Sequence, residues 1–205
     1  MKCQAPLILI LAAATLCGAD FKAGFGRRQI TPPMPIWLAG FAARTHPAEG
    51  IAHDLWTKAL ALEDDSGRKL IVITVDLVTM PKAMTDMVAA RVMRRHAISR
   101  SHLLINFSHT HSGPALSWPS NSDRAMMRRI EDYRSKVMDS MAEAAADAVS
   151  DLQPARISYG TGTVGFSHNR RERVPGGGWR FGMDPKGPVD RTVPVLRLSS
   201  ANGRL

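Results

Sequence analysis

A run of apolar and β-branched residues at Leu70–Val78 constrains the fold more than any other segment of this chain. Such residues on both faces are typical of a buried strand inside a sheet. Pro81 then opens a helix in which Met84, Met87, Val88 and Val92 recur at helical spacing, which we interpret as core packing. A second apolar strand follows at Leu103–Phe107.

Six further segments complete the predicted fold. Residues 23–43 read as an irregular entry with a short strand, and residues 160–190 as a long loop or a loop plus a ribbon. Strands are expected at Leu55–Glu63, from Arg156 to Tyr159, and at Val193–Leu198, where Pro194 indicates a sheet edge or a bulge. A helix is expected over Asp123–Val149, with an inward stripe of Ile130, Val137, Met141, Ala144 and Ala148. This order predicts an α/β fold, a mixed sheet with two amphipathic helices, with a layered α+β arrangement as the alternative.

The first nineteen residues read as a secretory signal peptide rather than as part of the fold. They combine a basic start, a short apolar centre and small residues up to Ala19. The apolar run is too short to span a bilayer, and no later stretch is long enough. We therefore expect a secreted or periplasmic protein with no transmembrane segment in the mature chain.

Only two cysteines occur, Cys3 and Cys17, and both lie in this leader. A mature chain that begins at Asp20 has no thiol. That excludes a disulfide scaffold, a cysteine nucleophile and a cysteine-ligated zinc site.

The chain is basic, with a formal net charge of +9. The arginines come as scattered pairs, and we see no aromatic residues interleaved with them as a single-strand nucleic-acid binder requires. We therefore expect no nucleic-acid partner. The favoured interpretation is a solvated basic surface with a modest preference for anionic interfaces.

One cluster carries candidate chemistry: His109-Thr110-His111, directly after the strand at Leu103–Phe107. In extended backbone, residues two apart point to the same side, so both imidazoles would face one cavity at the carboxyl end of the strand. Neutral imidazole is a preferred zinc ligand, and a catalytic zinc needs three protein ligands and an open position. The alternative is a structural histidine pair.

Weaker candidates lie around this cluster. Asp76, at the end of the neighbouring strand, either orients an imidazole or binds metal, or it caps a loop. Arg170 lies in the long polar segment and either clamps an oxyanion or belongs to a solvated charge pair. His53 and His168 read as ordinary surface or capping residues.

Several motifs together resemble the neutral (non-lysosomal) ceramidase family. They are Ala23-Gly24-Phe25-Gly26-Arg27, Ile30-Thr31-Pro32, Gly40-Phe41-Ala42, Thr74-Val75-Asp76-Leu77, and Asn169-Arg170 followed by Asp190 and Val193-Pro194-Val195-Leu196. The most specific of them is Ser108-His109-Thr110-His111-Ser112-Gly113-Pro114. The similarity covers nearly all of the mature chain.

The resemblance implies a zinc-dependent amidase that splits the N-acyl bond of ceramide, a lipid amide met at a membrane surface. It implies that His109 is a zinc ligand, that His111 contacts the substrate near the metal and that Arg170 is the active-site arginine. Two alternatives stay open: a non-catalytic exported binding module with a basic surface, and a zinc hydrolase of another ester or amide.

The resemblance also implies that residues 20–205 are the N-terminal portion of a larger catalytic domain, with the remaining ligands and the nucleophile further along. The Asn202-Gly203 pair supports this expectation, because it is a strong hairpin signal without a returning strand. We expect residues 20–205 alone to bind zinc weakly and to show no amidase activity.

Overall fold

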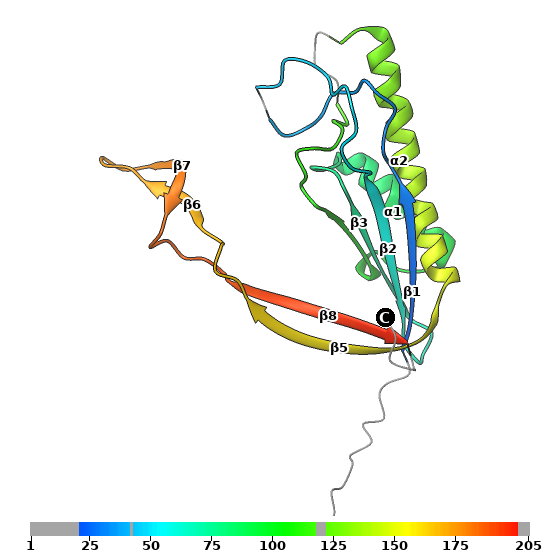
Figure 1. The fold of residues 1–205 in the computed structure, drawn as a ribbon. Coiled ribbons are helices and arrows are strands. Elements are labelled where there is room, and N and C mark those ends of the chain that lie inside the picture. The colour runs from blue at the N-terminus through cyan, green and yellow to red at the C-terminus, as the bar shows by residue number, and fades with distance from the viewer. Residues whose placement is uncertain (1–20, 42, 118–121, 201–205) are drawn as a thin grey trace, which may run out of the picture.

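The described residues form a six-stranded mixed sheet, of which the first four strands along the chain are covered on one face by two helices and form the body of the molecule (Figure 1). The computed structural model describes residues 21–41, 43–117 and 122–200. The signal peptide expected at 1–19 and the turn expected at Asn202-Gly203 lie outside the described residues. The architecture confirms the predicted α/β fold, a mixed sheet with two helices.

Within the described ranges, the elements follow one another as eight strands, two long helices and one short 3₁₀ turn. They are β1 (Phe21–Gln29), β2 (Trp56–Glu63), β3 (Lys69–Val75), α1 (Lys82–His96), the 3₁₀ turn (Arg100–His102), β4 (Leu103–Phe107), α2 (Arg124–Ser150), β5 (Gln153–Thr163), β6 (Asn169–Arg173), β7 (Trp179–Asp184) and β8 (Thr192–Ser200). The strand order is β4-β3-β2-β1-β5-β8 in the large sheet, and β6 and β7 pair separately. Only β3 and β4 are parallel, joined by the α1 crossover.

The core lies between the helices and one face of the sheet. Ile71, Ile73 and Val75 of β3 belong to the same buried cluster as the inward residues of α2. The opposite face of β3 carries Leu70 and Thr74, both exposed. The prediction that this strand is buried on both faces was therefore wrong. Among the described residues, both helices pack on a single face, so the strand alternates like a half-buried one.

The helix α2 begins and packs as its sequence predicts. The Asp123 carboxylate accepts a hydrogen bond from the Met126 amide at 2.7 Å and caps the first turn. All five residues of the expected inward stripe are fully buried: Ile130, Val137, Met141, Ala144 and Ala148.

The helix α1 agrees with the sequence prediction except at one residue. Pro81 precedes the helix as its N-cap, and Arg94, Arg95 and His96 form its last turn. The buried stripe runs through Val88, Ala89 and Val92. Met87 was expected in the core but is 49% exposed, because this stripe is displaced toward Ala89.

The strand β1 is longer and more regular than the irregular entry expected from the sequence. It pairs with β2 from Lys22 to Gln29 and, at its first three residues, with β5. Gly24 and Gly26 let α2 approach closely, since a Cβ at either position would lie 2.1 Å from a carbonyl oxygen of the helix. The sequence analysis noted these glycines only as part of a family motif, whereas the structure shows them as contact points between β1 and α2.

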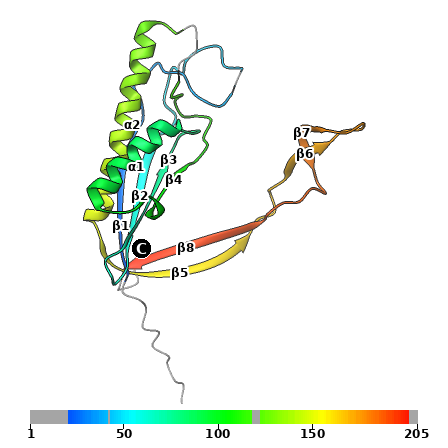
Figure 2. The same cartoon turned by 180° about the vertical axis from the view of Figure 1, so that it is seen from behind.

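Beyond β1, the sheet continues into a long β5–β8 ribbon that leaves the body of the molecule (Figures 1 and 2). β8 is an edge strand, which confirms the interpretation of Pro194. The segment between β5 and β8 contains the β6–β7 hairpin, so the loop-plus-ribbon alternative is the correct one. In both views this hairpin lies at the far end of the ribbon, away from the helices.

Candidate active site

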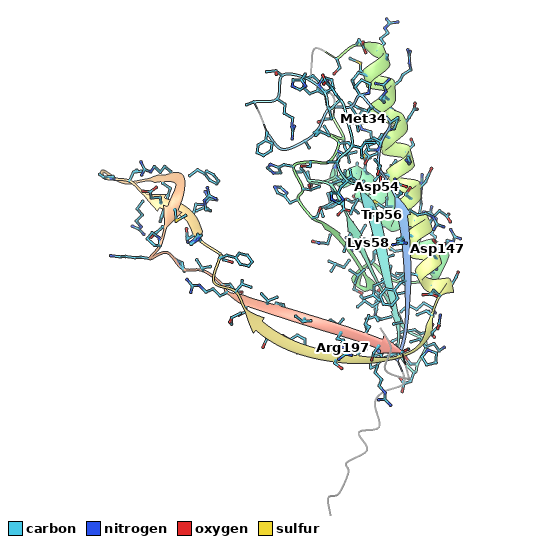
Figure 3. All side chains as sticks on the ribbon, viewed as in Figure 1. Met34, Asp54, Trp56, Lys58, Asp147 and Arg197 are labelled. Atoms are coloured by element: carbon cyan, nitrogen blue, oxygen red, sulfur yellow. The ribbon has the colours of Figure 1, made fainter. Side chains whose placement is uncertain are left out.

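The parallel strands β3 and β4 end side by side. The segments that follow these two strands therefore lie close together at one end of the sheet. The Ser108 amide donates to the Val75 carbonyl at 3.0 Å, and the His109 amide donates to the Leu77 carbonyl at 3.0 Å. The start of β2 lies at the same edge, where Figure 3 labels Asp54 and Trp56. This edge is the one at which ligands bind in α/β sheets.

His109 is oriented by the backbone of the neighbouring strand end. Its Nδ1 lies 3.0 Å from the Val78 carbonyl oxygen. A carbonyl only accepts, so Nδ1 carries a proton, and in the neutral imidazole the lone pair is then on Nε2. The side chain is exposed, so Nε2 is the nitrogen available to a ligand. A backbone carbonyl that fixes the tautomer in this way is typical of metal-binding histidines.

The two histidine rings lie close together, but not for the reason that the sequence suggested. Their centroids are 5.2 Å apart. We expected extended backbone through His109-Thr110-His111, yet His109 has a φ of 57°, in the left-handed region. A turn after β4, rather than strand alternation, places both imidazoles on one side.

A loop from the N-terminal part of the chain holds His111 in place. The Phe41 ring meets the His111 ring edge-on at 5.0 Å, and the Arg44 guanidinium donates to the His111 carbonyl at 2.6 Å. Gly40 has a φ of 103°, and a Cβ there would lie 2.3 Å from Cγ of His111. Only glycine allows the backbone this conformation and this approach.

The same loop is joined to the turn that follows the histidines. The Ala39 amide donates to the Gly113 carbonyl at 2.9 Å, and the Ala115 amide donates to the Trp37 carbonyl at 2.8 Å. Gly113 is buried, and a Cβ there would lie 3.0 Å from the Asp76 carbonyl oxygen. Backbone bonds on both sides thus fix the path of the chain around His111.

Asp76 acts as a backbone cap in this structure. Its Oδ2 accepts from the Trp56 amide at 3.0 Å, and its own amide donates to the Trp56 carbonyl at 3.0 Å. Of the alternatives left open for Asp76, the structure supports the loop cap. The Val78 carbonyl, not Asp76, contacts the His109 ring.

A buried tyrosine of α2 lies beneath this edge. Burial, and secondarily the charge of Asp76, raise the pKa of the Tyr133 phenol above its ordinary value. Within the described part of the chain, its hydroxyl has no hydrogen-bond partner. The neutral phenol therefore persists at any physiological pH.

The histidine pair fits part of a metal site. Two imidazoles that share one zinc at the usual Zn–N length hold their ring centres roughly 5 Å apart, which matches the observed spacing. Across residues 21–41, 43–117 and 122–200, no three His, Cys, Asp or Glu side chains cluster closely enough to hold a metal. By spacing alone either imidazole suits a metal, and the described residues do not supply a complete set of three donors. The family resemblance implies that His109 is the metal ligand and that His111 contacts the substrate.

Arg170 lies elsewhere in this structure. It belongs to β6, its guanidinium stacks 4.3 Å from the centroid of the Phe181 ring, and its Nε donates to the Gly182 carbonyl at 2.7 Å. In Figures 1 and 2 the β6–β7 hairpin lies apart from the segment that follows β4. The structure thus brings His109 and His111 together and does not bring Arg170 to them.

Sequence reasoning missed the residues that support His111. Gly40 and Phe41 were noticed only as part of a family motif, and no sequence pattern marked Arg44. Their role depends on a contact between residues about seventy positions apart, which local periodicity does not reveal.

The chain is similar in sequence to one family of known proteins. Residues 21–175 match the family model described as neutral/alkaline non-lysosomal ceramidase, N-terminal. The chain is 25% identical to the neutral ceramidase of Pseudomonas aeruginosa over 211 residues, covering 96% of this chain and 31% of that protein. It is 29% identical to the neutral ceramidase of Drosophila melanogaster over 113 residues, covering 52% of this chain and 16% of that protein.

Solved structures share the fold. A ceramidase complexed with C2 superposes with a TM-score of 0.70 at 23% identity, over 91% of this chain and 30% of that one. The crystal structure of neutral ceramidase from Pseudomonas aeruginosa gives a TM-score of 0.68 at 24% identity, with the same coverage. The chain spans less than a third of the length of these relatives.

Proposed function

The chain belongs to the neutral/alkaline non-lysosomal ceramidase family, and from this premise we propose that it forms part of the active site of a zinc-dependent lipid amidase. The bond cleaved is the N-acyl amide of a ceramide, which yields a fatty acid and a sphingoid base. The observation that carries the proposal is the pairing of His109 and His111 at the carboxyl ends of β3 and β4.

In this proposal His109 holds the zinc through Nε2. The Val78 carbonyl keeps the proton on Nδ1, so the imidazole is presented in the tautomer that a metal requires. A bound zinc supplies Lewis acidity, lowering the pKa of a water ligand and polarising the amide carbonyl.

His111 and Arg170 act on the substrate. An imidazole N–H of His111 donates to the oxygen of the amide carbonyl as negative charge develops there. The contacts from Phe41 and Arg44 restrict the position of His111. Less conformational entropy is therefore lost when its ring is oriented toward the substrate. Arg170 would share this role, which requires the β6–β7 hairpin to approach the histidines.

We also propose that the enzyme is exported, to the periplasm or the cell exterior. The sequence of residues 1–19 supports this proposal. Among the described residues, no helix combines the length and the apolar character needed to cross a bilayer.

The test compares turnover of ceramide by the full-length gene product with that of His111→Ala and Arg170→Ala. Loss of one oxyanion donor lowers turnover on the order of 10²–10³-fold, while zinc content stays at the wild-type level. His102→Ala is the control, because His102 lies at the opposite end of β4.

Unchanged turnover in either variant would remove that residue from the mechanism. A wild-type enzyme that cleaves other N-acyl amides or esters but not ceramide would show that the substrate class is wrong.

A further inference from the structure

Apart from Arg170, the β6–β7 hairpin carries charges and aromatic rings that the proposed chemistry does not use. Residues 169–187 contain five arginine or lysine side chains against two carboxylates. The hairpin also exposes large apolar side chains: Trp179 is 55% exposed, Phe181 82% and Met183 55%. Exposure of this kind, rimmed by charge, marks an interaction surface.

The pairing register sorts these residues between two faces. Arg171 lies opposite Phe181, and Arg173 lies opposite Trp179, so these four side chains share one face of the hairpin. Glu172 and Arg180, opposite each other, share the second face, where the Arg180 guanidinium donates to both carboxylate oxygens at 2.6 and 2.8 Å. One face is thus aromatic and cationic, and the other is neutralised by an ion pair.

Two arginines stack on the aromatic rings themselves. The guanidinium of Arg173 lies 4.7 Å from the centroid of the Trp179 ring, and that of Arg170 lies 4.3 Å from the centroid of the Phe181 ring. The edges of the two rings remain free to enter an apolar interface. The guanidinium groups then stay beside the rings. An amphipathic indole and an apolar phenyl ring, each with an adjacent arginine, match the boundary between acyl chains and phosphate headgroups.

We propose that the β6–β7 hairpin docks the protein on an anionic lipid bilayer. Trp179 and Phe181 enter the interface between headgroups and acyl chains, and Arg171 and Arg173 pair with headgroup phosphates. The choice of a lipid partner rests on the proposed lipid substrate. Among the described residues, the hairpin lies at the far end of the ribbon, apart from the helices (Figures 1 and 2).

Nucleic acid is the competing partner for such a surface. In the sequence analysis we saw no aromatic residues interleaved with the arginines. The structure differs in the hairpin, where Arg170 stacks on Phe181 and Arg173 stacks on Trp179. Single-stranded nucleic acid binds by stacking its bases on open ring faces. Here a guanidinium covers one face of each ring, which favours the bilayer.

The experiment measures co-sedimentation of the full chain with phosphatidylcholine vesicles that contain, or lack, phosphatidylglycerol. Binding is expected only with phosphatidylglycerol and should fall with added salt. Arg173→Gln should weaken binding about fivefold, the contribution of one cation near an anionic membrane. Trp179→Ser should weaken it on the order of tenfold, because the indole no longer enters the interface.

Two matched controls lie on α1, far from the hairpin. Arg94→Gln removes the same charge from an exposed site, and Met87→Ser removes a similarly exposed apolar side chain. Both should bind vesicles as the wild type does.

Several results would overturn the inference. These are no preference of the wild type for phosphatidylglycerol, equal losses in hairpin and control variants, or tighter binding to single-stranded oligonucleotide than to vesicles. Ceramide turnover is measured separately, with a short-chain ceramide dispersed without vesicles. Intact vesicle binding without turnover would refute the proposed function and leave the docking inference standing.

Discussion

Gly40 is the single residue on which the position of His111 depends most. Its backbone φ of 103° is one that residues with a side chain rarely adopt. The His111 ring occupies the space where a Cβ of residue 40 would lie. The sequence shows that Gly40 belongs to a motif but not why. The reason is a contact across seventy residues, formed only when the loop folds over the end of β4.

Gly40→Ala should therefore destabilise the protein by about 2 kcal/mol or more, from backbone strain and from displacement of the His111 ring. The measurement is the free energy of unfolding in urea. Gly50→Ala is the matched control, because a Cβ at Gly50 meets nothing within 4 Å. Equal unfolding free energies for the two variants would show that Gly40 is not constrained as described.

The histidine pair illustrates how far sequence reasoning reaches at this scale. The type, spacing and strand-end position of His109 and His111 were sufficient to predict that the rings lie together. The predicted backbone geometry was wrong, because His109 has a left-handed φ and its amide donates to the Leu77 carbonyl instead of continuing the strand.

At the scale of elements, the contact between β1 and α2 organises the sheet. Gly24 and Gly26 lie directly against the helix backbone, and the Phe25 amide between them donates to an Asp151 carboxylate oxygen at 2.9 Å. An ion pair between Arg28 and Asp147, the latter labelled in Figure 3, adds a contact further along the strand. Small residues here set the distance between the helix layer and the sheet.

Gly26→Ala should destabilise the fold by about 1–3 kcal/mol, because the added methyl would lie 2.1 Å from the Ala144 carbonyl and must displace the helix. Thermal and urea unfolding measure the effect. Gly160→Ala in β5 serves as the control, since its Cβ meets nothing within 4 Å. A Gly26 variant as stable as this control would contradict the close packing.

Periodicity predicted the helices well and the strands less well. The stripe of α2 repeats over about five turns, so its inward face was predicted correctly. In β3, an apolar run on both faces suggested full burial, but periodicity alone does not report how many layers cover a sheet. The β6–β7 pairing depends on a register shift between Asn169 and Arg171 that no simple alternation encodes.

At the scale of the whole molecule, the chain combines a family fold with two separated features. The histidine pair lies at one edge of the sheet, and the aromatic, cationic hairpin lies at the end of the β5–β8 ribbon. The first feature carries the proposed chemistry and the second the proposed contact with lipid. Arg170 belongs to the hairpin and is also the proposed oxyanion donor, so it links the two proposals.

The zinc content of the purified full-length gene product tests the central claim most directly. Elemental analysis of the wild type should give one equivalent of zinc, and His109→Ala should lose it, because this variant removes a proposed ligand whose tautomer the Val78 carbonyl fixes. His102→Ala, at the other end of β4, should keep the full equivalent. A His109→Ala variant that keeps a full equivalent of zinc would contradict the assignment of this edge of the sheet as the metal-dependent active site.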